Sequence, residues 1–375
     1  MDKKTWIWGV VAVVIIVLLV VFAGNKNQAS AGPIKIGASI SQTGYAAAFG
    51  ENSLKAMQMA VEEINGAGGM EGRQVELVVE DDNTEAKDAV TAFTKLVDID
   101  NVDAVIGGLW DFTAQPIFPL AVDKEVTFVS PSNFRIAGSF EPGSHGFVLL
   151  TEFDKTIRAL RSQLEESEGS NQIAIVRFSS AFGEQIATSL KAMAAEMGKS
   201  EVIDEKYANL GGNDFSTTVA KLKQAGVDTV FLDMLDSDIN NFLLRSKQQG
   251  FTPKVISHTL AKDALANPNI DTSLFGGVIV LDWEVSGPEF NQRFQEKYGV
   301  LPEKSASKSY DAVYVLAEAI ANSKDRASVN KYLESHTFTT INGEIKFTPE
   351  HAVENTDVEI RYIKDGQLLK VQSNG

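Results

Sequence analysis

From residue 33 onward, short apolar runs alternate with longer amphipathic segments, and this alternation constrains the fold more than any other feature. Short apolar runs bounded by turn residues are typical of buried strands, and the amphipathic segments between them are typical of crossover helices. Such a chain is expected to build an open parallel sheet with helices on both faces. The alternation runs to Ser130 and begins again at Gln172. We therefore expect an α/β protein with two doubly wound, Rossmann-like lobes.

The residue pattern also gives approximate bounds for each expected element. In the first half, the expected strands are 34–40, 74–80, 103–107 and 126–130, and the expected helices are 50–64, 85–97 and 114–122. In the second half, the expected strands are 172–178, 201–207, 229–232 and 254–257, and the expected helices are 182–197, 215–224 and 239–248. The remaining elements are a strand at 277–282, helices at 288–298 and 309–322, and a hairpin over 356–371 that turns at Asp365 and Gly366.

The N-terminus carries an uncharged run over residues 6–23, preceded by Lys3 and Lys4. Its length is near the lower limit for crossing a bilayer and exceeds the usual apolar region of a cleavable signal. Residues 29–31 read Ala-Ser-Ala, which matches a cleavage site, whereas the length and the two lysines suit an uncleaved anchor. Residues 1–32 are therefore expected to be a signal peptide, or a membrane anchor with a spacer. Both alternatives make the rest of the chain extracytoplasmic.

The charge balance argues against one large class of partners. The chain has 34 Lys plus Arg against 50 Asp plus Glu, which gives a net charge of −16. An acidic chain lacks the electrostatic attraction to phosphate backbones on which nucleic-acid binding depends. Cysteine is absent, so neither disulfides nor a cysteine-linked lipid anchor are expected.

Motifs for catalysis and metal binding are missing as well. The four histidines, His145, His258, His336 and His351, are scattered without the spacing of a metal site. The glycines of 66–72 end an expected helix, whereas a dinucleotide loop follows a strand and opens a helix. Neither a GxSxG elbow nor a phosphate-binding loop is present. We expect no metal, no cofactor and no enzymatic activity, and an enzyme is the weakest of the function classes considered.

In open parallel sheets, ligands bind beyond the carboxyl ends of the strands, where loops and helix N-termini converge. Two such sheets facing each other would form a cleft lined by hydroxyls, aromatic rings and carboxylates. Each residue type also has a structural explanation, because serines cap helices, aromatic rings pack in cores and aspartates are often solvated. The candidate ligand-binding residues are Tyr45, Trp110, Asp111, Phe112, Ser132, Asn133, Phe134, Phe182, Asp233, Asp236 and Thr259.

Several long segments resemble the type I periplasmic binding proteins of the branched-chain amino acid class. The segments that carry the resemblance are IGASISQTGYAAAFG at 36–50, AVEEINGAGGMEGRQVELVVEDDN at 60–83, VDAVIGGLWDFTAQPIFPLAVDKEVTFVSPS at 102–132, FGE at 182–184, NDFSTTVAKLKQAGVDTVF at 213–231 and SYDAVYVLAEAI at 309–320. The resemblance implies two doubly wound lobes joined by three crossing segments. It places the first lobe at 33–151 and 283–355 and the second lobe at 152–282 and 356–375.

Three positions of the family's ligand site differ in this chain. The serine after the family's IGxxxS strand falls near Asp111, and the threonine of its SPxxT segment, which helps to bind the ligand carboxylate, is replaced by Phe134. The family's aromatic residue before Gly-Glu is Phe182, which has no hydroxyl. The resemblance therefore implies the family's scaffold with an altered pocket.

The family's acidic residue, which receives the ligand ammonium group, falls near Thr259, so Asp233 or Asp236 is expected to replace it. The resemblance implies an extracytoplasmic solute-binding protein that delivers a small polar or amphipathic ligand, an amino acid or a similar compound, to an ABC permease. Its lobes are expected to close like a hinge on the ligand. The alternative is a receptor module of the same fold that signals to a membrane partner.

Overall fold

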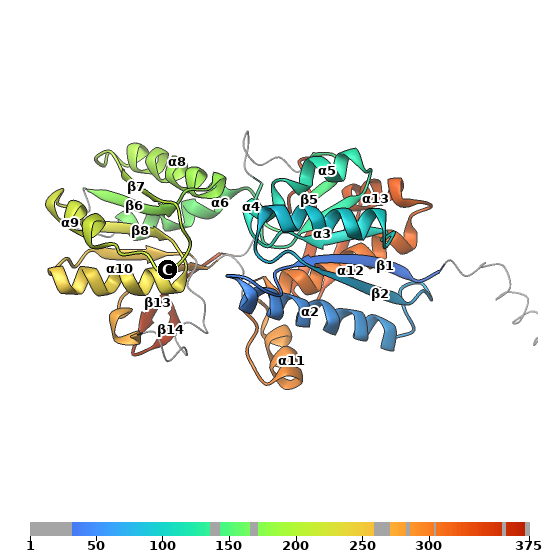
Figure 1. The fold of residues 1–375 in the computed structure, drawn as a ribbon. Coiled ribbons are helices and arrows are strands. Elements are labelled where there is room, and N and C mark those ends of the chain that lie inside the picture. The colour runs from blue at the N-terminus through green and yellow to red at the C-terminus, as the bar shows by residue number, and fades with distance from the viewer. Residues whose placement is uncertain are drawn as a thin grey trace, which may run out of the picture.

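The computed structural model describes residues 32–135, 143–165, 172–258, 271–282, 286–303, 305–354 and 358–371. These residues form two lobes that lie side by side (Figure 1). The predicted signal peptide or anchor falls outside the described residues. Within the described part, no helix is long and apolar enough to cross a membrane.

The first lobe is built on a parallel five-stranded sheet with the order β2-β1-β3-β4-β5. Its strands are β1 (Ile34–Ile40), β2 (Val75–Asp81), β3 (Ala104–Gly107), β4 (Thr127–Ser130) and β5 (Gly146–Val148). Every residue of β3 and β4 is buried, as expected for strands covered on both faces.

Side chains of the first sheet alternate between two hydrophobic cores. Val105 and Phe128 pack in the core under α3 (Ala86–Asp98) and α5 (Ile117–Asp123). Their neighbours, such as Ile106, belong to the opposite core, which α2 and α12 cover. This period-two alternation is what parallel strands with helices on both faces produce. Helix α2 spans Ala47–Gly66 and helix α12 spans Ala306–Asn322.

The second lobe repeats this architecture with a seven-stranded sheet of order β14-β13-β10-β9-β8-β6-β7. Its strands are β6 (Ile173–Phe178), β7 (Ile203–Tyr207), β8 (Thr229–Asp233), β9 (Lys254–Ser257), β10 (Ile279–Asp282), β13 (Glu359–Lys364) and β14 (Gln367–Lys370). Strands β6 to β10 are parallel and repeat the order of the first sheet, whereas β13 and β14 add an antiparallel edge. Its main helices are α8 (Ala181–Glu196), α9 (Ser216–Gln224) and α10 (Asp236–Gln249).

The β13–β14 hairpin turns at Asp365 and Gly366, as predicted. Both residues have positive φ angles, 52° and 73°, which a two-residue type I′ turn requires. Glycine adopts such a φ without steric cost, and Asp tolerates it better than most residues. The sequence pair therefore fixes the register between the two strands.

The structure corrects several predicted boundaries. The helix predicted at 114–122 is two short helices, α4 (Asp111–Ala114) and α5, because Pro116 at the N-cap of α5 has no N–H to continue the first one. Helix α2 begins at Ala47 rather than Gly50, and α10 begins at Asp236 rather than Ile239. The elements without a predicted counterpart are β5, α6 (Phe153–Ile157), α7 (Arg161–Glu165), α13 (Val329–Ser335), β11 (Thr337–Thr340) and β12 (Gly343–Lys346).

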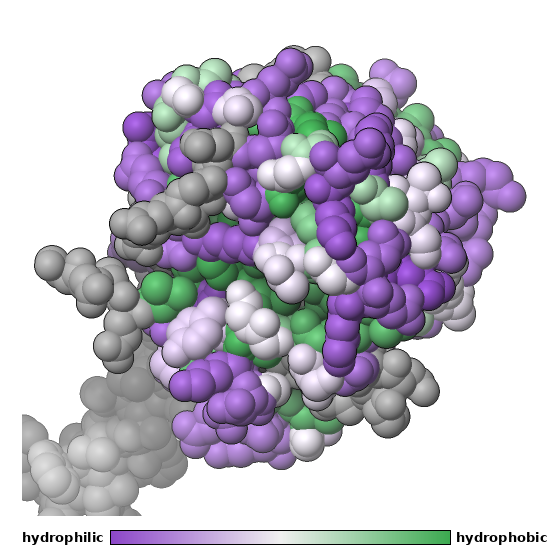
Figure 2. All heavy atoms as spheres, turned by 90° about the vertical axis from the view of Figure 1, so that its left-hand side faces the viewer, coloured by the Kyte–Doolittle hydropathy of each residue, from purple (hydrophilic) through white to green (hydrophobic). Residues whose placement is uncertain are grey.

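The chain returns to the first lobe after β10. Helix α11 (Pro288–Tyr298) contributes Phe290 and Phe294 to the core that α2 and α12 share. The Ser53 and Ser305 hydroxyls lie 2.8 Å apart although 252 residues separate them in the sequence. The lobe boundaries inferred from the family resemblance stay a prediction. Figure 2, viewed toward the second lobe, shows a mainly hydrophilic surface with small hydrophobic areas, in keeping with the acidic composition.

Candidate ligand-binding cleft

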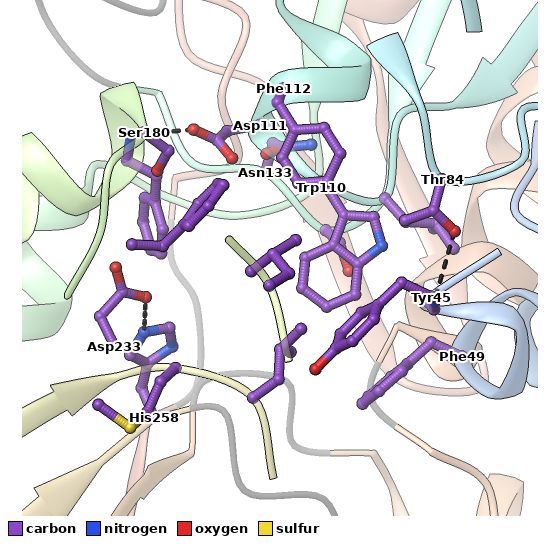
Figure 3. Close-up of a pocket in the computed structure, with 18 of the residues that line it drawn as sticks. Tyr45, Phe49, Thr84, Trp110, Asp111, Phe112, Asn133, Ser180, Asp233 and His258 are labelled. Carbon is purple, nitrogen blue, oxygen red and sulfur yellow. Dashed lines mark hydrogen bonds and ion pairs between the residues drawn. The ribbon is translucent and has the colours of Figure 1, made fainter. Parts of the chain in front are cut away.

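A cavity lies between the lobes, at the carboxyl ends of both sheets. It holds about 980 Å³ of space free of protein atoms, including the part open to solvent. This position is typical of small-molecule sites in α/β proteins. Figure 3 shows side chains from both lobes converging on it.

The structure brings most of the sequence-predicted residues together around this cavity. The lining includes Tyr45, Trp110, Asp111, Phe112, Ser132, Asn133, Phe134, Phe182 and Asp233. Asp236 is not among the described lining residues, because it occupies the first turn of α10, beyond the end of β8. Thr259 lies outside the described residues.

Further lining residues were not among the predicted ones. They are Ala46, Phe49, Thr84, Leu109, Phe178, Ser180, Tyr207, Leu210, Met234, Leu235, His258 and Ser305. Ser180, Met234 and His258 follow strand ends, so the rule that found the others also reaches them. Ser305 carries no such signal, because it reaches the cavity from the start of α12.

Three phenylalanines from different segments pack together, and two of them, Phe134 and Phe182, line the cavity. The rings of Phe134 and Phe182 are stacked with centroids 5.9 Å apart, and Phe153 meets both edge-on at 5.3 Å. Phe134 follows β4 of the first lobe and Phe182 lies in the first turn of α8 of the second lobe, so this cluster joins the lobes. Phe134 is 2% exposed, and it fills the position where the family resemblance would place a threonine hydroxyl.

A second aromatic group extends along the cavity. Trp110 stacks on Phe112 with centroids 6.4 Å apart, and Phe49 meets Trp110 edge-on at 5.6 Å. The ring of Phe112 meets the ring of Phe178 of the second lobe edge-on, with centroids 6.4 Å apart. The faces of these rings offer apolar surface to a ligand and favourable electrostatics to a cation.

Asp111 links the two lobes through a charge-assisted hydrogen bond. Its Oδ2 accepts from the backbone N–H of Phe182 at 3.0 Å, and its carboxylate also bonds to the Ser180 side chain (Figure 3). Ser180 in turn caps α8, because its Oγ accepts from the Gly183 N–H at 3.0 Å. Burial raises the pKa of Asp111 above its usual range, and the charge of Asp233 raises it further, while the hydrogen bonds oppose these effects.

Asp233 and His258 form a buried pair within the second lobe. His258 Nε2 lies 2.8 Å from Asp233 Oδ1. His258 is 4% exposed and Asp233 is 7% exposed. The His258 ring stacks on Phe231, which fixes its orientation. Asp233 Oδ2 packs over Gly183, where a Cβ would lie only 2.9 Å away. This carboxylate therefore depends on a glycine in the first turn of α8.

Two tyrosines also line the cavity, Tyr45 from the first lobe and Tyr207 from the second. The hydroxyls of Tyr45 and Ser237 lie 3.3 Å apart across the cleft, and the Tyr45 ring packs over Gly211. The Tyr207 hydroxyl donates to the backbone oxygen of Asp233 at 3.0 Å. Burial raises the pKa of both tyrosines, so they remain protonated at neutral pH.

The polar groups of the cavity are suited to binding. No group of three or more His, Cys, Asp or Glu residues in the described part of the chain could hold a metal ion. The Asn133 amide donates to the Ser130 hydroxyl at 2.7 Å, the Ser180 hydroxyl accepts from the Gly183 N–H, and the Asp111 carboxylate accepts from the Phe182 N–H, so the protein itself orients these groups.

A family model described as periplasmic binding protein matches residues 33–367. The chain belongs to the periplasmic binding protein family. This is a family of solute-binding proteins, not of enzymes. The chain is 28% identical over 362 residues to the leucine-, isoleucine-, valine-, threonine- and alanine-binding protein of Pseudomonas aeruginosa, an alignment that covers 92% of this chain and 93% of that protein.

Solved structures of other periplasmic binding proteins share the fold. The substrate-binding protein of the branched-chain amino acid transporter of Streptococcus pneumoniae, in complex with isoleucine, superposes with a TM-score of 0.78 at 20% identity. This match covers 90% of this chain and 99% of that one. An ABC transporter solute-binding protein of R. palustris in complex with benzoate gives a TM-score of 0.76 at 18% identity, covering 91% and 96%. Relatives of this periplasmic binding protein thus bind chemically different ligands on one scaffold.

Proposed function

We propose that the protein is an extracytoplasmic solute-binding protein of an ABC importer, which captures a small amphipathic ligand by closing its two lobes. The observation that carries the proposal is a cavity bordered by both lobes, with polar and aromatic contacts that cross it. Asp111 bonds to the N-terminus of α8, and Phe134 stacks on Phe182. These contacts form when the lobes approach, so a ligand that touches both walls favours the closed state by its differential affinity.

The partner that reads this closure is proposed to be an ABC permease. Relatives of the chain are amino-acid-binding proteins, and one protein of the same fold is the substrate-binding protein of a transporter. A permease that contacts both lobes distinguishes the closed from the open arrangement, because closure changes the relative position of the two contact surfaces. Co-purification of the full chain with a permease tests this partner, and capture of a signalling protein in its place would favour the receptor alternative.

Closure is tested by small-angle X-ray scattering with and without candidate ligands. Binding is tested in parallel by thermal unfolding, because a ligand present at 100 times its dissociation constant adds about 2.7 kcal/mol to the stability. We expect one class of ligand to raise the unfolding temperature and to reduce the radius of gyration together. A ligand that stabilises the protein without a change in scattering would contradict closure as the output.

The N-terminal segment is proposed to place these lobes outside the cytoplasmic membrane. Fractionation of cells that express the full chain, followed by mass determination of the mature protein, distinguishes a cleaved signal from an anchor. Recovery of the full-length chain in the cytoplasm would contradict the proposed location.

A further inference from the structure

We infer that the ligand of this cleft is an organic cation, an amine or quaternary ammonium group on an apolar or aromatic body, without a carboxylate. The inference rests on the proposed function and specifies the ligand class of the same site. It is drawn from three features of the cavity: the charges of its lining, the use of its helix N-terminus, and its aromatic faces.

The first feature is the charge of the lining. Asp111 and Asp233 both border the cavity, and no Lys or Arg is found among the described residues that line it. His258 is the basic group of the lining, and its Nε2 is paired with Asp233. Among the described lining residues, a ligand carboxylate would therefore meet two aspartates and no guanidinium or ammonium group.

The second feature is the N-terminus of α8, where backbone N–H groups would attract an anionic ligand. Here the protein's own groups already occupy these donors. The Phe182 N–H donates to Asp111 Oδ2, and the Gly183 N–H donates to Ser180 Oγ, each at 3.0 Å. A carboxylate could bind there only by displacing Asp111, and it would remain beside that residue's like charge.

The two carboxylates belong to different lobes, which connects the ligand's charge to closure. Asp111 begins α4 of the first lobe, and Asp233 ends β8 of the second. In the closed arrangement both carboxylates line one cavity, and the negative charge of Asp233 disfavours the ionised form of Asp111. A positive ligand offsets this repulsion, whereas a neutral or negative ligand leaves it in place.

The third feature is the aromatic surface. Among the described lining residues are the rings of Tyr45, Phe49, Trp110, Phe112, Phe134, Phe178, Phe182 and Tyr207. Figure 3 shows Asp111 and Asp233 on one side of the view and Tyr45, Phe49 and Trp110 on the other. A cation over aromatic faces is stabilised by their negative π-surface, and an apolar body gains by burial against the rings.

The experiment compares ligands that differ in one charged group. The probes are 2-phenylethylamine, its trimethylammonium analogue, phenylalanine, 3-phenylpropionate, leucine and benzoate, each titrated into the full chain by calorimetry. We expect the two cations to bind and to produce closure in scattering. Addition of the carboxylate in phenylalanine is expected to weaken binding at least about tenfold relative to 2-phenylethylamine, because the carboxylate is buried without a partner.

Variants test which residue recognises the charge. Asp111→Asn is expected to weaken binding of 2-phenylethylamine at least about tenfold, with a smaller effect on its neutral analogue 2-phenylethanol. Circular dichroism checks that each variant folds. Asp233→Asn, in the other lobe, is the second variant if Asp111→Asn does not fold. Asp123→Asn, at the exposed end of α5, is the matched control and should leave binding unchanged.

The outcomes separate the two proposals. If leucine, phenylalanine or benzoate binds more tightly than both cations and closes the lobes, the inference is overturned and the proposed function stands. If neither cation binds at millimolar concentration, the inference is also overturned. If ligands bind but none changes the scattering, the proposed function fails, whatever their charge.

Discussion

The two lobes have the same strand order around the cleft, but they hold their acidic groups differently. Asp111 follows β3 of the first lobe, and Asp233 ends β8, the corresponding strand of the second. Asp233 is paired with His258 of its own lobe, whereas Asp111 also accepts hydrogen bonds from Phe182 and Ser180 at the N-terminus of α8 in the other lobe. Opening the cleft would therefore leave the Asp233 pair intact and would return Asp111 to water. If the lobes close as proposed, only Asp111 of these two acids would change its surroundings on closure.

The largest effect that would break this arrangement is expected from Gly183→Ala. The added Cβ would lie 2.4 Å from the Phe178 backbone oxygen and 2.9 Å from Asp233 Oδ2, so the first turn of α8 must move. We expect a loss of about 3 kcal/mol in unfolding free energy, the upper part of the range for overpacking, together with weaker ligand binding. Urea unfolding measures the first effect and calorimetry the second.

Gly66→Ala serves as its control, because Gly66 ends α2 and has open space where a Cβ would lie. This substitution should be neutral or slightly stabilising in a helix. If Gly183→Ala were as stable as Gly66→Ala and bound ligand as tightly, the packing of Asp233 against α8 would not matter for the site.

A second prediction uses Asp311, an acid buried in the first lobe away from the cleft, as a reference for Asp111. Burial raises the pKa of Asp311 to about 6, although Asn342 donates to its carboxylate at 2.9 Å. The folded protein thus binds this proton more tightly than the unfolded chain, and stability falls as pH rises from about 4 to about 6. The loss is on the order of 2 kcal/mol.

Asp311→Asn should remove this pH dependence. The difference in unfolding free energy between wild type and variant is therefore expected to change between pH 4 and pH 6. Outside that window it should be constant. Ligand should not alter this difference, because Asp311 does not line the cavity. For Asp111→Asn, by contrast, ligand should alter the pH dependence. Equal responses of the two variants to ligand would remove the distinction between a structural acid and a closure-sensitive one.

The smallest effect is expected at the rim of the cleft. Tyr45 is 45% exposed, and its hydroxyl lies 3.3 Å from that of Ser237. Tyr45→Phe should reduce ligand affinity by about 0.5 kcal/mol, the low end for a hydrogen bond open to solvent. Ser237→Ala and the double variant complete a mutant cycle, and a coupling energy near zero would show that this contact does not contribute to closure.

The strand pattern could be predicted from sequence because parallel strands covered on both faces are apolar along most of their length. The three residues of β5 are too few to give such a signal, and α6 and α7 are only five residues each. Pro116 interrupts the helix because it has no backbone N–H. The continuous apolar pattern of 114–122 gave no sign of this interruption. Local periodicity thus predicts long elements well and short ones poorly.

Part of the cavity lining was predictable from the positions of the strand ends. Asp233 is the last residue of β8 and Trp110 lies between β3 and α4, and both line the cavity. Asp236 is not among the described lining residues, because it lies in the first turn of α10, beyond the end of β8. Phe49 was missed because α2 was expected to begin one residue after it. The pairing of Asp111 with α8 depends on how the lobes meet, which no local pattern encodes.

The long sequence separation between α2 and α12 has a consequence for biosynthesis. Until α12 emerges from the ribosome, the apolar face of α2, with Met57 and Ala60, lacks the helix that buries it. The core shared by α2 and α12 therefore cannot form until residues 306–322 have been made, although the strands of this first lobe are made early. The second lobe likewise lacks its antiparallel edge until β13 and β14 have been made, so both lobes expose hydrophobic surface while synthesis continues.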